Sequence, residues 1–353
     1  MKRNHIFISI CIAMAGIFVL FRFHAQFFPV QYKNITSSGA FSLITEPDDG
    51  IAPVLTMIRG ASASVDLVMY EFDDPQIESA LVADERRGVA VRVILSAGYQ
   101  GAMSTMNGAV YDYLTARGIP VRWSPSYFSL THEKSLVVDS DRALVMTFNL
   151  VSNYYATGRD FGIVDDDTRD VEAMKDTFND DWEGSATPGR GTPASGGNNG
   201  DSGDDLLWSP GSEPALINLI DGARKSLYIY NEEMADPVVT KALIDAARRG
   251  IAVYVDMTGA LEWKWEFEEL TTAGVHVRTY ADADDAPLYV HAKVIVADGE
   301  SASARAFVGS ENFSATSLSD NRELGIILTD PGIITSLIKT YTADWRGATP
   351  FAP

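Results

Sequence analysis

The segment HEKSLVVD, residues 132–139, returns later in the chain as HAKVIVAD, residues 291–298. Both segments read H-x-K-x-x-x-x-D, and in both a hydrophobic run separates the polar start from the aspartate. Residues two apart on a strand point to the same side, so the His and Lys of each segment share one face while the run beyond them is buried. One such match is weak, but two matches indicate that the chain contains the same unit twice.

The sequence before each motif is duplicated as well. A helical pattern runs over residues 74–88, and one of the same length runs over residues 236–250. Each begins with Asp-Pro and ends with Arg-Arg-Gly, which is the usual order of a capping residue, a first-turn proline and a terminating glycine. A strand candidate precedes each helix and another follows it. Alternating strands and helices predict two similar α/β lobes with mixed sheets and a shared site at their seam.

Composition sets the boundaries of these lobes. A basic start followed by an uncharged apolar stretch predicts a signal peptide or membrane anchor over residues 1–25, and therefore an extracytoplasmic location. A run rich in Gly, Ser, Pro and Asn predicts a flexible linker over residues 183–205. The first lobe is then expected over residues 41–182 and the second over residues 206–348.

Charge and cysteine content exclude several classes of protein. Asp and Glu total 48 against 28 Lys and Arg, a formal net charge of −20 that repels bare polyanions. Non-specific coating of nucleic acid is therefore disfavoured, although a local basic cleft would still suit a nuclease. The single cysteine is Cys11, in the N-terminal segment. The lobes can build neither a disulfide framework nor a thiolate metal cluster.

The two motifs carry residue types that suit a bound phosphate. Lysine neutralises the non-bridging oxygens, and histidine attacks phosphorus or protonates a leaving oxygen. Each motif is followed by a hydroxyl, an amide and, later, a carboxylate that would orient the imidazole of the opposite motif. A solvated strand end is the alternative interpretation of the carboxylates. These residues are Thr147, Asn149 and Asp160 after the first motif, and Ser310, Asn312 and Glu323 after the second.

From about Phe41 to Trp345, the paired motifs, with G-S-x-N at residues 309–312, resemble the phospholipase D superfamily. The resemblance implies two lobes related by a pseudo-twofold axis, both motifs in one cleft, and no requirement for a metal or other cofactor. Met146-Thr147 departs from the Gly-Ser of the family. The resemblance implies that the phosphate site is lined by His132, Lys134, Asn149, His291, Lys293, Ser310 and Asn312, with Thr147 supplying a hydroxyl. Asp139 and Asp298 would complete the catalytic motifs as structural partners.

The resemblance also implies a two-step reaction. One histidine attacks phosphorus while the other protonates the leaving alcohol, and water or a second alcohol then attacks the phosphohistidine. The family favours His132 as nucleophile and His291 as general acid and base. The leading function is phosphatidyl hydrolysis or transfer by a monomer acting on a phospholipid at a membrane surface. A secreted nuclease and a non-catalytic binding module remain as alternatives, with nucleic acid the less expected partner.

Two further groups are interpreted as structural. The aromatic residues of the segment 263–267 are expected to pack in the core of a helix, although contact with an acyl chain or a membrane is the alternative. The run Asp165-Asp166-Asp167 is expected to be a solvated acidic turn, because a calcium loop needs alternating ligands and a glycine.

Overall fold

The computed structural model describes residues 41–98, 105–186, 205–283 and 285–352. The predicted signal peptide or anchor, with Cys11, lies outside the described residues, and so does most of the predicted linker. None of the helices within these four ranges combines the length and the apolar character that a membrane span requires.

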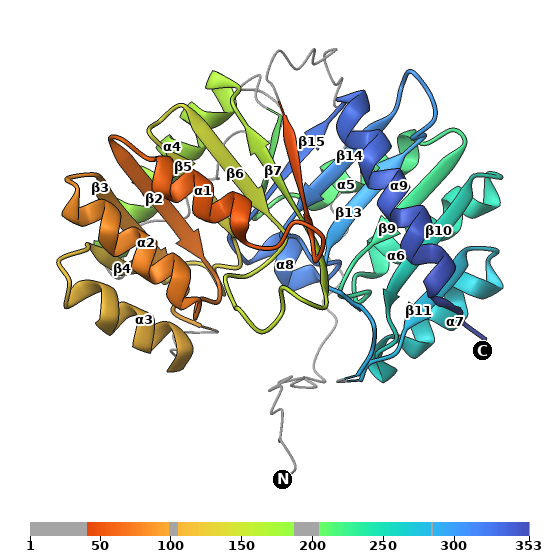
Figure 1. The fold of residues 1–353 in the computed structure, drawn as a ribbon. Coiled ribbons are helices and arrows are strands. Elements are labelled where there is room, and N and C mark those ends of the chain that lie inside the picture. The colour runs from red at the N-terminus through yellow and green to blue at the C-terminus, as the bar shows by residue number, and fades with distance from the viewer. Residues whose placement is uncertain (1–40, 99–104, 187–204, 284, 353) are drawn as a thin grey trace, which may run out of the picture. The chain divides into compact units, whose positions relative to one another are not determined.

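The first lobe is a mixed sheet with helices packed against it (Figure 1). Its strand order is β1-β7-β6-β5-β2-β3-β4; β2, β3 and β4 are parallel, and the other neighbours are antiparallel. The strands are β1 (Ser42–Glu46), β2 (Ser64–Met69), β3 (Ala90–Leu95), β4 (Val121–Trp123), β5 (Ser135–Val138), β6 (Arg142–Met146) and β7 (Gly158–Asp165). The helices are α1 (Ala52–Gly60), α2 (Pro75–Arg86), α3 (Thr105–Thr115) and α4 (Thr168–Ala186).

The second lobe repeats this plan. Its order is β16-β11-β10-β9-β13-β14-β15-β8, with β9, β10 and β11 parallel and the rest antiparallel. The strands are β8 (Leu206–Ser209), β9 (Ser226–Tyr230), β10 (Ala252–Thr258), β11 (His276–Tyr280), β13 (Lys293–Ala297), β14 (Arg305–Gly309), β15 (Glu323–Leu328) and β16 (Thr349–Pro350). The helices are α5 (Glu213–Gly222), α6 (Pro237–Arg248), the 3-10 turn η2 (Leu261–Trp263), α7 (Lys264–Thr272), α8 (Ala315–Ser319) and α9 (Pro331–Gly347).

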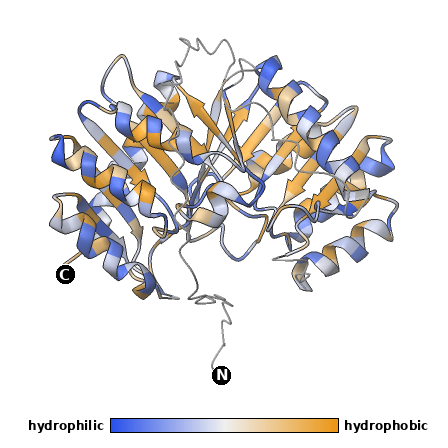
Figure 2. Cartoon of the chain, turned by 180° about the vertical axis from the view of Figure 1, so that it is seen from behind, coloured by the Kyte–Doolittle hydropathy of each residue, from blue (hydrophilic) through white to orange (hydrophobic). Residues whose placement is uncertain are grey.

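Read in reverse from β8 to β11, the second order matches the first strand for strand, with β16 added at its edge, which confirms the predicted fold class. The lobes meet where β6 and β7 contact β14 and β15, and one hydrophobic cluster draws on both, including Val145, Ile163, Val308 and Ile326. The strands in this region are strongly hydrophobic, whereas the helices carry many hydrophilic residues (Figure 2). A further short strand, β12 (Tyr289–Val290), leaves the second lobe and pairs with β7 of the first.

The predicted helix signals act as expected in both lobes. Asp74 accepts hydrogen bonds from the backbone N–H groups of the first turn of α2, and Asp236 does the same for α6. Each helix has Pro in its first turn, and each is followed by a glycine with positive φ, Gly88 at 90° and Gly250 at 87°. Such a φ favours glycine because a Cβ would be strained there.

The start of the predicted linker at residue 183 was too early, because α4 continues to Ala186. The Ser185 hydroxyl donates to the carbonyl of Asp181 at 2.7 Å in this last turn. Gly184 leaves room for Tyr127, whose hydroxyl oxygen a Cβ would meet at 2.6 Å. The remaining linker residues, 187–204, lie outside the described ranges.

Two structural interpretations also need correction. Trp265 is 77% exposed, so it does not pack in the core, whereas Phe267 is buried and Trp263 packs partly against the core as expected. The run of three aspartates is not a solvated turn, since Asp165 and Asp167 are buried. Asp165 accepts the N–H of Asp167, and Asp167 accepts that of Arg169, so this run orders the start of α4.

Candidate active site

Each motif is held in place by the opposite lobe. The N–H groups of His132 and Glu133 donate to the carbonyl oxygen of Arg322 at 2.9 and 3.0 Å. Across the seam, the N–H groups of His291 and the residue after it donate to the carbonyl of Arg159 at 3.2 and 2.9 Å. Both arginines precede the carboxylates that the sequence singled out. The backbone pairing therefore brings each histidine to the carboxylate of the other lobe.

Each histidine contacts the carboxylate of the opposite lobe. His132 Nδ1 lies 2.8 Å from Glu323 Oε2, and His291 Nδ1 lies 2.9 Å from Asp160 Oδ1. A carboxylate accepts, so Nδ1 carries the proton and Nε2 of each ring is left for the substrate. These are the contacts between opposite halves that the sequence predicted, and they exclude a solvated strand end for either carboxylate, since both are buried.

The hydroxyls of Ser310 and Thr147 lie behind the histidines. Ser310 Oγ donates to Glu323 at 2.7 Å and accepts the N–H of Leu324, and Thr147 donates to Asp160 and accepts the N–H of Phe161. Both hydroxyls are thus engaged with the orienting carboxylates. Threonine in the first lobe supplies the same hydrogen bond as serine in the second.

The two lysines are fully buried. Each Nζ donates to the carbonyl oxygen of the histidine two residues earlier, at 2.6 Å in both lobes. Burial, together with the positive charge of Lys293, lowers the pKa of Lys134 to about 7. The positive charge of Lys293, in the second lobe, thus acts on Lys134 in the first.

His132 is buried and uncharged near neutral pH. Burial lowers its pKa to about 4, although the charge of Glu323 opposes this shift. An imidazole must be neutral to act as a nucleophile, so this environment suits attack by His132. The pKa of Glu323 stays below its usual range despite burial, because His132 pairs with it.

Asn149 and Asn312 follow the strands that run beneath the motifs. The side-chain oxygen of each is buried and has no hydrogen-bond partner among the described residues. Asn312 Nδ2 lies 3.4 Å from Glu232 Oε2. Buried amide groups without partners are costly, which fits groups that wait for a ligand.

Asp139 and Asp298 lie at the other ends of the motif strands and contact neither histidine. Asp139 accepts the N–H groups of residues 62–64 at 2.7–3.0 Å, and Asp298 accepts those of residues 224–226 at 2.7–3.2 Å. Each aspartate therefore fixes the turn that leads into the neighbouring strand, β2 or β9. This placement fits a structural partner of the motif rather than a group that touches substrate.

Sequence reasoning missed Glu232. Its Oε2 accepts from Lys293 Nζ at 2.9 Å and lies 3.5 Å from His291 Nε2, and its Oε1 accepts from the Tyr289 hydroxyl at 2.9 Å. The duplication held a usable signal, because Glu232 stands four residues before one Asp-Pro pair and Tyr70 stands four residues before the other. The Tyr70 ring packs edge-on against His132, with centroids 4.6 Å apart.

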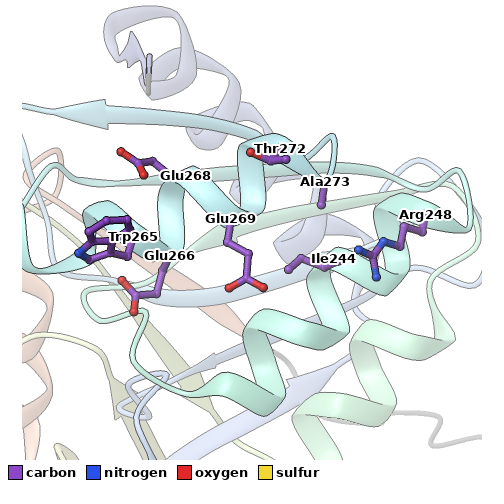
Figure 3. A pocket seen from close by; sticks show the side chains of 8 residues that line it. All are labelled: Ile244, Arg248, Trp265, Glu266, Glu268, Glu269, Thr272 and Ala273. Atoms are coloured by element: carbon purple, nitrogen blue, oxygen red, sulfur yellow. The ribbon is translucent and has the colours of Figure 1, made fainter.

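A surface hollow elsewhere does not belong to this site. Figure 3 shows it between α6 and α7, lined by residues such as Arg248, Trp265 and Glu269 and by none of the motif residues. Among the described residues, no group of His, Cys, Asp or Glu has the arrangement of a metal site.

Comparisons with known proteins agree with this geometry. The family described as "Cardiolipin synthase, PLD-like domain" matches twice, at residues 54–182 and 216–345. A cardiolipin synthase of Listeria monocytogenes is 22% identical over 88% of this chain and 70% of its own length. A mitochondrial cardiolipin hydrolase of Xenopus laevis is 29% identical over 38% of this chain and 62% of its own, and a phospholipase D of Rickettsia conorii is 32% identical over 37% and 60%.

The chain thus spans about three fifths of the length of these last two relatives. Among solved structures, phosphatidylserine synthase of Haemophilus influenzae has a similar fold, with a TM-score of 0.67, 13% identity and coverage of 88% of this chain and 87% of that one. Polyphosphate kinase of Porphyromonas gingivalis gives a TM-score of 0.65 at 16% identity, covering 94% of this chain and 51% of that one.

Proposed function

Because the chain belongs to the cardiolipin synthase family with phospholipase D-like domains, we propose that it hydrolyses or transfers the phosphatidyl group of a phospholipid through a phosphohistidine intermediate. The observation that carries this proposal is the crossed pairing of His132 with Glu323 and of His291 with Asp160. Two oriented imidazoles at one seam, each held through Nδ1 so that Nε2 is the nitrogen left for chemistry, match the needs of in-line attack and leaving-group protonation.

In the proposed reaction His132 Nε2 attacks phosphorus, and the bond to the leaving alcohol breaks as His291 donates a proton to its oxygen. Water, or an acceptor alcohol, then loses a proton to His291 and attacks the phosphorus of the phosphohistidine, and the P–N bond breaks to release His132. Lys134 and Lys293 offset the charge on the equatorial oxygens. His132 is assigned to attack because it is the more buried ring and is neutral near pH 7.

The intermediate provides the direct test. Each variant, His132→Asn and His291→Asn, is mixed with a p-nitrophenyl phosphodiester, quenched in acid and weighed intact by mass spectrometry. The His132 variant is expected to form no adduct. The His291 variant is expected to accumulate one, because p-nitrophenolate leaves without a proton. An adduct on the His132 variant alone would reverse the assignment, and an adduct on neither wild type nor variant would remove the proposed mechanism.

Substrate class is tested by competition. Mixed phospholipids and DNA are offered together with a chelator present, and the products are analysed. We expect phospholipid products only, because the net charge of −20 and the carboxylates of the site oppose a polyanion. We further propose that the enzyme acts as an extracytoplasmic monomer at a membrane surface. DNA cleavage at a comparable rate would favour a nuclease instead.

A further inference from the structure

The large hydrophobic side chains that are exposed to solvent gather at one edge of the two sheets. Among the described residues they are Tyr154, Val238, Leu261 and Trp265. Each lies in a segment that follows the carboxyl end of β6, β9 or β10. His132 and His291 lie at the same edge, because they precede β5 and β13, which run antiparallel to β6 and β9. Apolar exposure and the candidate site therefore share one edge of the molecule.

Backbone contacts tie Leu261 and Trp265, which are 89% and 77% exposed, to the second motif. The N–H of Val290, the residue before His291, donates to Thr258 Oγ1 at 2.9 Å. Thr258 ends β10, and Leu261 opens η2 three residues later. The helix α7 continues η2 directly and carries Trp265 in its first turn (Figure 3). Side chains four residues apart in helical segments are neighbours, so these two form one exposed apolar pair.

The other two exposed side chains belong to segments that also build the site. Tyr154 lies between β6 and β7, in the segment that carries Asn149. Val238 lies in the first turn of α6, whose capping residue donates its N–H at 2.7 Å to the carbonyl oxygen of the residue after Asn312. The described turns at the opposite edge carry no exposed large hydrophobic side chain. Such a one-sided distribution is typical of an interaction surface.

Charge decides which kind of partner suits this edge. Four of its segments contain neither lysine nor arginine, namely residues 147–157, 231–236, 259–263 and 281–288. Glu262, Asp282 and Asp285 are exposed in these segments, and the nearby Lys264 pairs with Glu268 at 3.5 Å. An anionic surface would be repelled. A zwitterionic lipid surface has no net charge and accepts apolar side chains, tryptophan above all, at its boundary with water.

We propose that Leu261 and Trp265, together with Tyr154 and Val238, form a docking surface that inserts into a zwitterionic phospholipid surface and holds the site against it. This inference rests on the proposed function, because the site would receive its substrate from the membrane rather than from solution. It assigns membrane contact to the folded lobes and not to the N-terminal segment alone. The attachment is apolar, so it should persist at high salt.

Quenching of tryptophan fluorescence by brominated acyl chains tests the insertion, because contact quenching needs the indole to enter the lipid. Trp265 is exposed, the other described tryptophans are buried or half-buried, and the predicted N-terminal anchor contains none. Vesicles of brominated phosphatidylcholine should quench the full chain, and Trp265→Phe should remove at least about half of this quenching. Leu261→Ser keeps the indole but should weaken the quenching roughly tenfold at a fixed, low lipid concentration, because one buried leucine side chain is lost.

Arg248→Ser is the matched control. Arg248 is exposed and lines the same surface hollow as Trp265, but it lies in the last turn of α6, at the opposite edge. It should keep the wild-type quenching, and thermal melts should show that all three variants are folded. Brominated phosphatidylglycerol should quench the wild type less than phosphatidylcholine does at low salt.

Three results would overturn the inference. The first is quenching that Trp265→Phe and Leu261→Ser leave unchanged, and the second is stronger quenching by the anionic vesicles. The third is a wild-type dimer that Leu261→Ser dissociates in sedimentation, which would assign the surface to a second copy of the chain.

A water-soluble p-nitrophenyl phosphodiester separates failure of this inference from failure of the proposed function. Leu261→Ser and Trp265→Phe should turn it over within about twofold of the wild-type rate, because neither residue belongs to the motifs. Turnover and adduct formation without quenching by lipid would remove the inference alone. Quenching that depends on both residues, with no adduct in any protein, would keep the docking surface and remove the proposed mechanism.

Discussion

The two lobes have the same strands and the same motif but differ in the segment beneath each histidine. The first lobe has Met146 and Phe148 where the second has Gly309 and Glu311. A Cβ on Gly309 would lie 2.4 Å from Glu311 Oε2 and 2.5 Å from the Cα of Gly325, so the second lobe needs glycine there. Burial, with the charge of Glu323, raises the pKa of Glu311 well above its usual range.

A second difference, Tyr70 against Glu232, lies in the site itself. Both lobes share the groups that hold the imidazoles. These are the lysine that donates to the histidine carbonyl oxygen, the carboxylate that contacts the histidine of the other lobe, and the hydroxyl that donates to that carboxylate. The groups that differ face the substrate or fill the core behind it. The comparison indicates that the lobes are equivalent in how they orient a histidine and unequal in what they offer to a ligand.

The strongest test of the shared part removes the orienting charge from each lobe in turn. Glu323→Gln and Asp160→Asn should each lower kcat by about 10³-fold, because an amide no longer fixes the Nδ1–H tautomer. Turnover of a p-nitrophenyl phosphodiester measures this. Glu323→Gln should also slow adduct formation, whereas Asp160→Asn should slow its release. A loss below tenfold in either variant would show that its lobe does not need the carboxylate.

The difference between Gly309 and Met146 predicts an effect on stability. Gly309→Ala should lower the free energy of unfolding by about 1–3 kcal/mol, because the new methyl group overlaps Glu311 and the backbone of Gly325. Chemical denaturation measures this loss. Gly222→Ala is the matched control, since nothing lies within 4 Å of a Cβ built there. Equal stability of the two variants would mean that β14 and β15 separate at little cost.

The pKa values of His132 and Lys134 predict how kcat/KM depends on pH. His132, with a pKa of about 4, is neutral and able to attack across the range above pH 5. Lys134, with a pKa of about 7, loses its positive charge as pH rises through 7. We expect kcat/KM to be level from about pH 5 to 6, to begin falling near pH 7 and to be roughly tenfold lower by pH 9, because kcat/KM reports the free enzyme. Lys134→Met should be slow throughout and lack this fall.

The smallest effect on catalysis is expected where the lobes are most alike. Asp139→Ala and Asp298→Ala should each cost about 1–3 kcal/mol of stability, since several backbone N–H groups lose their acceptor. At a temperature where the variants are folded, kcat should stay within about threefold of wild type, because neither aspartate contacts a histidine. A loss of 100-fold or more would place the aspartate in the reaction rather than in the turn.

The duplication explains why so much was predictable. Periodicity and the Asp-Pro and Gly signals act within one helix or strand, so α2, α6 and the motif strands could be predicted from local sequence. The contacts of Asp160 and Glu323 could be predicted because matching positions in two lobes must meet matching partners across one seam. Repetition supplied the long-range information that a single lobe lacks.

What escaped prediction depends on packing between distant segments. Glu232 follows β9 and belongs to no recognisable motif in the sequence. Only the folded second lobe brings it to Lys293 and Asn312. The engagement of Ser310 and Thr147 behind the histidines also needs the paired strands to be known. Trp265 was misjudged because helical spacing in a short acidic segment does not tell which face is covered.

The crossed His–carboxylate pairs have a consequence for the origin of the chain. Neither half contains a complete pair, so an ancestor with one lobe would have needed a second copy of itself to orient any histidine. Joining two lobes in one chain makes that partnership permanent and removes the requirement that both be identical. Positions such as 70 and 232 can then differ, whereas a self-associating single lobe would carry every change twice.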